Sequence, residues 1–462
     1  MKITNLARSA ALPRRRIFLF LIAFCLALVT GAQAQQDQDR ATAAADRQAM
    51  LSQLGIGELR PPVSQRTANY DESKANPYPS LPDPLRMANG QPVRSAADWW
   101  QHRRPELLEI FSREVLGRVP ANAPHVTWKL LSQSQETAAG RSVVVKHLAG
   151  QLDNSAYPAL QVSIDLLVVT PAEARHPVPL VMEVAFPQEA MPALARYFPE
   201  MLPGGKGNEG PSWQEQVLSR GWGYAVLLPT SFQEDSPLGL RRGLIGLTNH
   251  GQARRPDDWG ALRAWAWGAS RAMDFFETDP AIDAQHVALE GHSRFGKTAL
   301  VAMATDPRFA AAYISSAGTG GGKPYRHIYG EQLENLAGTS SWHWMAGNFL
   351  KFSGPKTVDE LPVDAHELIA LCAPRPVFIG VGSATAGDAW ADPTGEFLGA
   401  MAAGPVYKLL GARDLGTTQM PPMETALTQG DLAFRQHRFG HTPGPNWPVF
   451  LNFFARYLKP TK

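Results

Sequence analysis

The residues that decide the fold are Val287-Ala-Leu-Glu-Gly-His-Ser-Arg-Phe-Gly-Lys-Thr-Ala-Leu300. A short β-rich run leads to Gly291, and a run with helical periodicity begins directly after Ser293. A serine on a sharp turn between a strand and a helix is typical of a nucleophile elbow, which presents the hydroxyl at the carboxyl edge of a sheet. Two residues separate Ser293 from Gly296, so the strict Gly-x-Ser-x-Gly pattern is not met. A serine that only caps the helix is therefore the alternative interpretation.

β-rich runs and amphipathic helical patterns alternate on both sides of this turn. We expect strands at 143–148, 162–170, 178–186, 223–229, 286–289, 311–316 and 376–381, and helices at 97–115, 259–276, 294–305 and 447–458. The segments 187–220 and 230–255 are expected to be long loops, and the second is a candidate binding loop. This alternation predicts an α/β protein with a mostly parallel central sheet and helices on both faces, a three-layer sandwich.

The N-terminal residues have the pattern of an export signal. Arg14-Arg15-Arg16 precede an apolar run at 17–30, and Ala32-Gln33-Ala34 provides a small-x-small cleavage site. We therefore expect an exported protein, located in the bacterial periplasm or outside the cell. The chain should have three parts: a signal peptide at 1–34, a polar leader at 35–75 that is partly disordered or helical, and a catalytic domain at 76–462. The sequence holds no later run of about 18 apolar residues, so no stable membrane insertion is expected after signal removal.

Charge and cysteine content exclude several classes of partner. The chain has 462 residues, of which 44 are basic and 42 acidic. Five basic residues and no acidic ones lie in the first 34, so the rest of the chain carries a net charge of −3. A near-neutral chain argues against a nucleic acid partner. Removal of the signal takes Cys25 with it and leaves only Cys372, so no internal disulfide is expected. The histidines are scattered, and neither a metal nor another cofactor is expected.

A serine nucleophile needs a base and an acid, which in this kind of fold follow it in the order acid, then histidine. His441 lies in a loop rich in glycine and proline, just before the last expected helix, where the base is expected. Asp388 and Asp392 both follow the expected strand at 376–381. Either carboxylate could accept a hydrogen bond from the imidazole. Asp392 precedes a proline, so it could instead cap a turn.

Several separated motifs together resemble the bacterial glucuronoyl esterases of carbohydrate esterase family fifteen, in the α/β-hydrolase superfamily. The resemblance covers the chain from about Asn76 to the C-terminus. It rests on Asp257-Asp-Trp-Gly260, Ala264-Trp-Ala-Trp-Gly268, Gly291-His-Ser-Arg-Phe-Gly-Lys297, Leu361-Pro-Val-Asp-Ala-His-Glu367, Ala373-Pro-Arg-Pro376, Trp390-Ala-Asp-Pro393 and the His441 loop. The Gly-x-Ser-Arg-x-Gly-Lys turn is more specific than a general hydrolase elbow.

The resemblance implies an α/β-hydrolase fold and a carboxylic ester hydrolase. Its substrate would be an ester between (4-O-methyl)glucuronic acid of xylan and a lignin alcohol, cleaved through an acyl-enzyme. Ser293 would be the nucleophile, His441 the general base and Arg294 the cation beside the oxyanion, where a fixed charge stabilises the transition state. The resemblance also implies sugar-binding side chains at Lys297, Glu331 and Trp390.

The catalytic acid is where this sequence differs from many members of that family. Many members carry a glutamate 23 residues after the serine, in an Asn-Glu-Ser-Gly segment. Here the segment reads Ser315-Ser316-Ala317-Gly318, so Ser316 occupies the position of the acid. Some bacterial relatives use an acid after the later strand, and Asp388 occupies that position. We therefore predict a triad of Ser293, His441 and Asp388, with Asp392 as the alternative acid.

Two other functions remain open on the sequence. One is another carbohydrate or aryl esterase, such as a deacetylase, and the other is a non-catalytic glycan-binding relative that has lost its acid. Single residues also have plainer explanations: Arg294 and Lys297 as solvated helix charges, Trp390 as a core residue and Glu331 as a surface acid. A monomer is expected. The sequence does not specify the leaving alcohol, the xylan length or a need for 4-O-methylation.

Overall fold

The structure is a computed structural model that describes residues 37–78, 80–202 and 204–458. The predicted signal peptide at 1–34 lies outside these residues. The chain divides into two units, residues 1–49 and 50–462. Of the predicted leader at 35–75, residues 37–53 are helical. None of the helices in the described ranges is both long enough and apolar enough to span a membrane.

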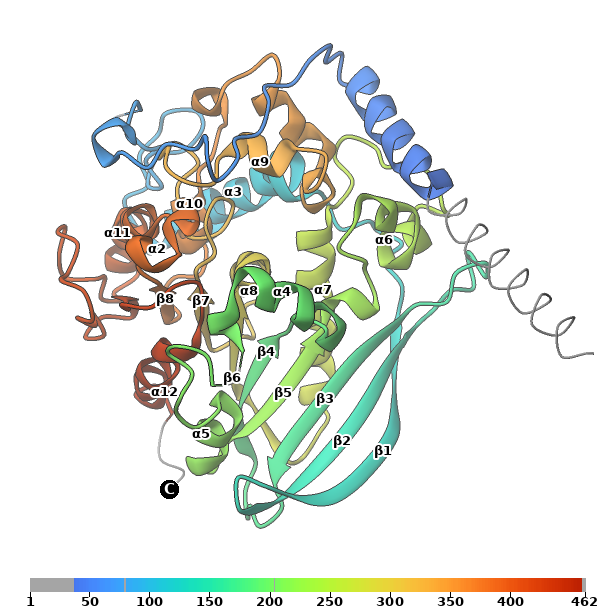
Figure 1. Ribbon diagram of the computed structural model, residues 1–462, viewed down its shortest axis with the longest axis vertical. Coiled ribbons are helices and arrows are strands. Elements are labelled where there is room, and N and C mark those ends of the chain that lie inside the picture. The colour runs from blue at the N-terminus through green and yellow to red at the C-terminus, as the bar shows by residue number, and fades with distance from the viewer. Residues whose placement is uncertain (1–36, 79, 203, 459–462) are drawn as a thin grey trace, which may run out of the picture. The chain divides into compact units, whose positions relative to one another are not determined.

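One mixed sheet organises the larger unit (Figure 1). Within the described residues it has nine strands in the order β1-β2-β3-β5-β4-β6-β7-β8-β9. The strands are β1 (Val126–Ala138), β2 (Arg141–Leu152), β3 (Ser163–Pro171), β4 (Val178–Val184), β5 (Gly223–Leu228), β6 (Ile282–His292), β7 (Ala311–Ser315), β8 (Val377–Val381) and β9 (Leu432–Gln436). The pairs from β5 through β9 are parallel, whereas β1, β2, β3 and β5 pair antiparallel. The carboxyl ends of the parallel strands therefore share one edge, where a catalytic site is expected.

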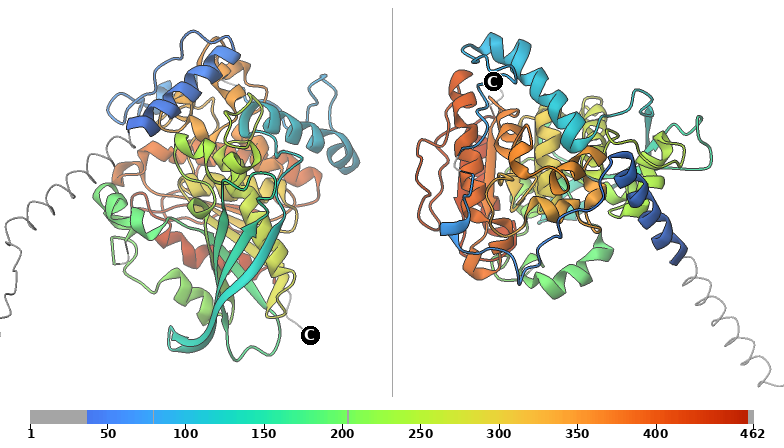
Figure 2. Two further views of the ribbon diagram at one scale, coloured as in Figure 1. Left: turned by 90° about the vertical axis from the view of Figure 1, so that its right-hand side faces the viewer. Right: turned by 90° about the horizontal axis from the view of Figure 1, so that it is seen from above.

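Helices cover both faces of this sheet (Figure 2). The labelled helices of the structure are α2 (Ala96–Asp98), α3 (Arg104–Ile110), α4 (Met191–Tyr197), α5 (Trp213–Ser219), α6 (Gly243–Thr248), α7 (Ala261–Phe276), α8 (Arg294–Thr305), α9 (Leu333–Ala337), α10 (Ala365–Ala370), α11 (Pro393–Leu409) and α12 (Trp447–Ala455). Helices α7, α8, α10 and α11 contribute to the larger apolar core on one face. Helices α5 and α12 pack on the other face, against side chains such as Val181 and Phe378. The predicted three-layer α/β fold is confirmed.

The elements around the predicted nucleophile turn agree well with the sequence. All seven expected strands are present, and α8 has the bounds expected for it. The helix expected at 97–115 is a continuous helical segment, in which the π-helical stretches Trp99–Arg103 and Phe111–Leu116 flank α3. These elements carry strong apolar periodicity, which is the main signal of secondary structure in a sequence.

Two expectations about the loops were wrong in part. The segment 187–220 contains α4 and α5, and the segment 230–255 contains α6, so neither is a plain loop. These helices have six or seven residues, too few for a clear periodic pattern. The sequence also gave no prediction of β1, β9, α10 or α11. Strand β1 is mostly exposed and polar at the edge of the sheet, so it lacks the apolar alternation of a half-buried strand.

Candidate active site

Ser293 stands on a tight turn between β6 and α8. Its backbone has φ 58° and ψ −126°, a conformation that a non-glycine residue adopts only at a cost of about 1–3 kcal/mol. Within the described residues its side chain makes no capping hydrogen bond to α8, so Ser293 is not an ordinary N-cap. Glycine is required on both sides, because a Cβ on Gly291 would lie 2.1 Å from the Phe295 carbonyl oxygen and one on Gly296 2.9 Å from that of Ser315. The turn has the geometry of a nucleophile elbow.

Asp388 and His441 form a buried pair beside this turn. His441 Nδ1 lies 2.7 Å from Asp388 Oδ1. The other carboxylate oxygen of Asp388 accepts hydrogen bonds from the Ser316 hydroxyl at 2.7 Å and the Gly382 amide at 2.6 Å. The carboxylate is thereby fixed in position and its charge is stabilised. This arrangement can hold the imidazole in the tautomer with Nε2 free to accept a proton.

The His441 ring is adjacent to the nucleophile turn. Its centroid lies 4.2 Å from that of His292, the residue before Ser293, and 4.7 Å from that of Phe198. No hydrogen bond joins the Ser293 and His441 side chains in the part of the chain that the structure describes. Catalytic hydrogen bonds of this kind commonly tighten only when substrate binds. Burial lowers the pKa of His292 well below its usual value, so this neighbouring imidazole is neutral at neutral pH.

The structure gives Asp392 a different partner. Its carboxylate accepts a hydrogen bond from the Gly395 amide at 2.9 Å and so caps the N-terminus of α11. The other oxygen lies 2.6 Å from His327 Nδ1. Asp392 is fully buried in these contacts. Its position corresponds to the structural alternative that the sequence left open, in which this aspartate is a cap.

Arg294 is the first residue of α8 and follows the nucleophile directly. Its guanidinium lies over the ring of Trp344, 5.3 Å from the centroid, and near the ring of Phe186 at 5.9 Å. Its Nη1 donates a hydrogen bond to the Asp235 carboxylate at 2.5 Å. The guanidinium is thus held by aromatic rings and an acid instead of being freely solvated. It can act as a fixed cation beside the negative oxygen of a tetrahedral intermediate that forms when Ser293 attacks an ester.

Lys297 lies one turn along α8 from Arg294, near the same Trp344 ring, and contacts Glu331, which in turn contacts Trp390. Lys297 is buried and its ammonium donates to the Ala317 and Thr319 carbonyl oxygens, both at 2.7 Å, and to Glu331 Oε2 at 2.8 Å. Those three bonds use all three donors of an ammonium group. The Glu331 amide donates to the Trp390 carbonyl oxygen at 3.0 Å. Lys297 therefore orients Glu331, and a sugar hydroxyl would meet the carboxylate more directly than the ammonium.

Glu396 is a buried acid that sequence reasoning did not identify. It projects from α11, and its Oε1 accepts a hydrogen bond from the Gly318 amide at 2.5 Å. Burial raises its pKa to about 8, so the carboxyl is largely protonated at neutral pH. In the unfolded chain an ordinary glutamate ionises near pH 4.5. Between these two values the native state binds more protons than the unfolded state, so the free energy of unfolding falls as pH rises.

The variant Glu396→Gln tests this charge state. It should leave the melting temperature nearly unchanged at pH 5, because the native carboxyl is protonated there and glutamine has a similar shape. The free energy of unfolding of the variant should increasingly exceed that of the wild type between pH 5 and 8, by at most about 1.4 kcal/mol per pH unit. The difference should level off above pH 8. Thermal unfolding measured from pH 5 to 9 provides the check. A difference between the two proteins that does not change with pH would contradict the assignment.

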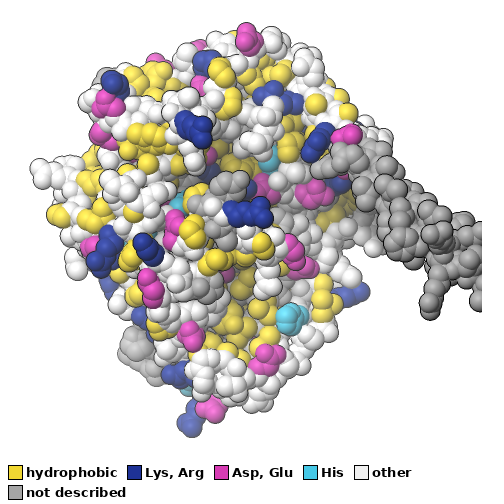
Figure 3. Space-filling model, in the orientation of Figure 1, with side chains coloured by type: hydrophobic (Ala, Val, Ile, Leu, Met, Phe, Trp, Pro, Cys, Tyr) yellow, Lys and Arg dark blue, Asp and Glu magenta, His cyan; other side chains and the backbone are white. Residues whose placement is uncertain are grey.

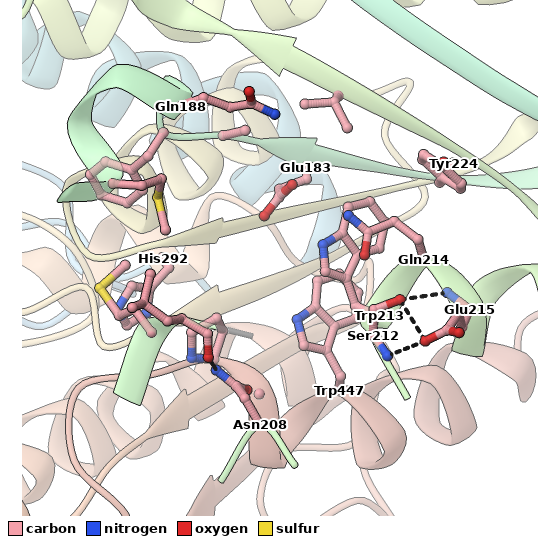
Figure 4. Close-up of a pocket in the computed structure, with 18 of the residues that line it drawn as sticks. Glu183, Gln188, Asn208, Ser212, Trp213, Gln214, Glu215, Tyr224, His292 and Trp447 are labelled. Carbon is pink, nitrogen blue, oxygen red and sulfur yellow. Dashed lines mark hydrogen bonds between the residues drawn. The ribbon is translucent and has the colours of Figure 1, made fainter. Parts of the chain in front are cut away.

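A cavity of about 1750 Å³ lies next to this site, between the sheet and the segment 188–216. Hydrophobic side chains gather in the hollow (Figure 3). Glu183, Trp213 and His292 are among its lining residues (Figure 4), but Ser293 and Arg294 are not. The cavity adjoins the catalytic groups, because two of its lining residues contact them: His292 lies beside His441, and Phe186 lies beside Arg294.

This chain is similar to a known protein family, to relatives in sequence and to solved structures. Residues 254–411 match the family model described as glucuronyl esterase, fungi. The chain is 33% identical over 419 residues to the carbohydrate esterase MZ0003 from an unknown prokaryotic organism, a match that covers 85% of this chain and 93% of that protein. A glucuronoyl esterase of family CE15 from Teredinibacter turnerae T7901 has 45% identity and a TM-score of 0.83, over 90% of this chain and 99% of that chain. This chain belongs to the glucuronoyl esterase family.

Other members of the family have the same architecture. The structure described as a promiscuous CE15 esterase from the marine bacterial metagenome has 30% identity and a TM-score of 0.71, covering 85% of this chain and all of that one. A 4-O-methyl-glucuronoyl methylesterase from Schizophyllum commune is 28% identical over 345 residues, 72% of this chain and 74% of that protein. The resemblance seen in the sequence is confirmed, and so is the α/β-hydrolase fold that it implied.

In this glucuronoyl esterase family member, the residues around the site include several that the sequence did not identify as functional. Asp235 contacts Arg294, and Ser316 contacts Asp388. Asp235 lies in the segment that was expected to be a binding loop, but that expectation specified no residue. Its partner is 59 positions away in the sequence. A contact over that distance leaves no periodic pattern in a single sequence.

Proposed function

We propose that this protein is a serine esterase that hydrolyses (4-O-methyl)glucuronoyl esters between xylan and lignin alcohols. The observation that carries the proposal is the 2.7 Å contact between His441 Nδ1 and Asp388 Oδ1, beside the strained turn of Ser293. Arg294 follows that serine and is held in a fixed orientation. A nucleophile, a base with its orienting acid, and a cation for the oxyanion are the groups that acyl transfer requires.

The reaction has two halves. The Ser293 hydroxyl attacks the uronoyl carbonyl while His441 Nε2 takes its proton, and Asp388 stabilises the imidazolium that forms. The tetrahedral intermediate carries its negative charge beside Arg294. As it collapses, the bond to the leaving alcohol breaks and His441 returns the proton to that oxygen. Water then attacks the acyl-enzyme with His441 as base, which releases the uronic acid and restores the serine.

The sugar side of the substrate has a built polar site. Glu331, oriented by Lys297, can accept hydrogen bonds from sugar hydroxyls, and the partly exposed Trp390 offers an apolar face. An acetyl group has no hydroxyls to use this site. Since specificity is a difference in transition-state binding, such contacts favour a uronoyl ester over an acetyl ester.

Export is part of the same proposal. The arginine run, the apolar stretch at 17–30 and the Ala32-Gln33-Ala34 site support secretion into the bacterial periplasm or beyond it. Glucuronoxylan esterified to lignin is a polymer that a cell meets outside its cytoplasm, which fits such a location.

The substrate assignment predicts a clear preference between two esters. The kcat/KM for benzyl glucuronate should exceed that for p-nitrophenyl acetate by at least about 10-fold, although the nitrophenolate is the better leaving group, because only the glucuronate uses the sugar site. Hydrolysis measured with purified protein, with the Ser293→Ala variant as background, gives the ratio. Equal or faster acetate hydrolysis would favour the general esterase. Tight uronate binding without hydrolysis or fluorophosphonate labelling would favour a glycan-binding protein.

A further inference from the structure

Asp235 is the centre of a cluster of side chains that converges on Arg294. Its Oδ1 accepts a hydrogen bond from Trp344 Nε1 at 2.7 Å and lies 3.0 Å from His343 Nε2. Its Oδ2 accepts the bond from Arg294 Nη1. One carboxylate thus joins three side chains from two separate segments. We propose that Asp235 is a positioning residue for the reaction, which fixes the orientation of Arg294 toward the oxyanion; this inference rests on the proposed function.

The charged pair in this cluster consists of the Asp235 carboxylate and the Arg294 guanidinium. Burial alone would raise the pKa of the Asp235 carboxyl, but the hydrogen bond from His343 and the charge of Arg294 outweigh it and hold that pKa well below its usual range. Burial lowers the pKa of His343, so that imidazole is neutral at neutral pH. A neutral imidazole next to an ionised carboxylate donates through Nε2. Arg294 is therefore the cation that pairs with Asp235.

The aromatic rings and Asp235 restrict different motions of the guanidinium. The rings of Trp344 and Phe186 attract the guanidinium through cation–π contacts, with centroids 5.3 and 5.9 Å away. Such contacts do not fix the direction in which its N–H groups point, and the hydrogen bond from Nη1 to Asp235 does. Trp344 serves both purposes, because its ring contacts Arg294 and its Nε1 donates to Asp235.

Donors of Arg294 remain for a ligand in this arrangement. Nη1 is used by Asp235, whereas Nη2 makes no hydrogen bond among the described residues and about a third of the side chain is exposed. A guanidinium donor that is accessible and has no protein partner can donate to a bound group. The negative oxygen of the tetrahedral intermediate is such a group. Asp235 thus holds one side of the guanidinium so that the remaining donors are oriented before the reaction begins, which is the basis of electrostatic preorganisation.

Asp235→Asn and Asp235→Ala test this role. We expect kcat for benzyl glucuronate to fall about 10- to 100-fold while KM stays within about 3-fold, because the lost interaction acts mainly in the transition state. The rate of Ser293 labelling by a fluorophosphonate should fall in parallel. Added formate should partly restore kcat in Asp235→Ala by occupying the vacated carboxylate position. The matched control is Asp257→Asn, which removes an aspartate that pairs with Arg118 at 2.9 Å on the surface.

A double-mutant cycle separates positioning from a purely structural role. In an Arg294→Leu background, Asp235→Asn should cause little further loss of kcat, since the two residues act as one unit. Full additivity, an unchanged kcat, or a kcat raised by removal of the negative charge would overturn the inference. The labelling rate does not depend on the sugar. If wild-type protein fails to cleave the glucuronate but Asp235→Asn still slows labelling, the proposed substrate is wrong and the positioning role stands.

Discussion

Asp388→Asn is expected to lower kcat by about 10³–10⁴-fold with little change in KM. An asparagine amide at this position cannot hold His441 in the tautomer that leaves Nε2 free, nor stabilise the imidazolium. His441 Nδ1 lies 2.7 Å from Asp388 Oδ1. Among the described residues, no other carboxylate contacts the His441 ring. Steady-state kinetics on benzyl glucuronate, with Ser293→Ala as the floor, measures the loss.

Asp392→Asn is the matched comparison for that experiment. It changes the same atoms four positions along the chain, but Asp392 caps α11 and contacts His327 instead of His441. Its kcat should stay within about 3-fold of wild type, while loss of the cap charge lowers the melting temperature. If Asp388→Asn kept near-native turnover and Asp392→Asn lost it, the assignment of the acid would be wrong.

The contact between Ser316 and Asp388 shows that residues after two neighbouring strands reach the same place beside His441. Ser316 follows β7 and Asp388 follows β8, and these two strands are parallel neighbours. Their carboxyl ends therefore lead to the same place at the edge of the sheet. The Ser316 hydroxyl is 2.7 Å from the Asp388 carboxylate, so a side chain from either strand can reach His441 or its acid. A serine at the first position is a donor to the acid at the second.

The sequence was sufficient for the elements with strong periodicity and for the nucleophile turn. The strand, Gly291, Ser293 and the following helix are adjacent in the chain, and local sterics dictate their geometry. The choice between Asp388 and Asp392 was different, because both aspartates follow one strand and the residues alone left them equivalent. The folded backbone distinguishes them, because the Gly382 amide holds the Asp388 carboxylate where it contacts His441.

Interactions between distant segments could not be predicted from the sequence. Lys297 was expected to reach toward sugar hydroxyls, but the carbonyl oxygens of Ala317 and Thr319 and the Glu331 carboxylate occupy its donors. Glu396 was not identified at all, since its burial depends on the packing of α11 against the segment around Gly318. Each of these depends on which loops meet at the edge of the sheet, and a single sequence does not contain that information.

Arg294→Leu is expected to lower kcat by about 10²–10³-fold, the loss typical of removing one oxyanion donor, which corresponds to about 2.7–4 kcal/mol. Leucine is apolar and lacks the guanidinium that lies near the rings of Trp344 and Phe186. KM should change little, because the ester carbonyl of the bound substrate carries far less negative charge than the tetrahedral intermediate.

Arg294→Lys distinguishes the need for a positive charge from the need for a planar, oriented group. An ammonium keeps the charge but cannot bind Asp235 with one edge and the oxyanion with another in a fixed plane. We therefore expect its kcat to lie between those of wild type and Arg294→Leu. Both variants should still unfold cooperatively, since Asp235 retains its contacts with His343 and Trp344. A lysine variant with wild-type kcat would show that charge alone suffices, and a leucine variant with wild-type kcat would remove Arg294 from the mechanism.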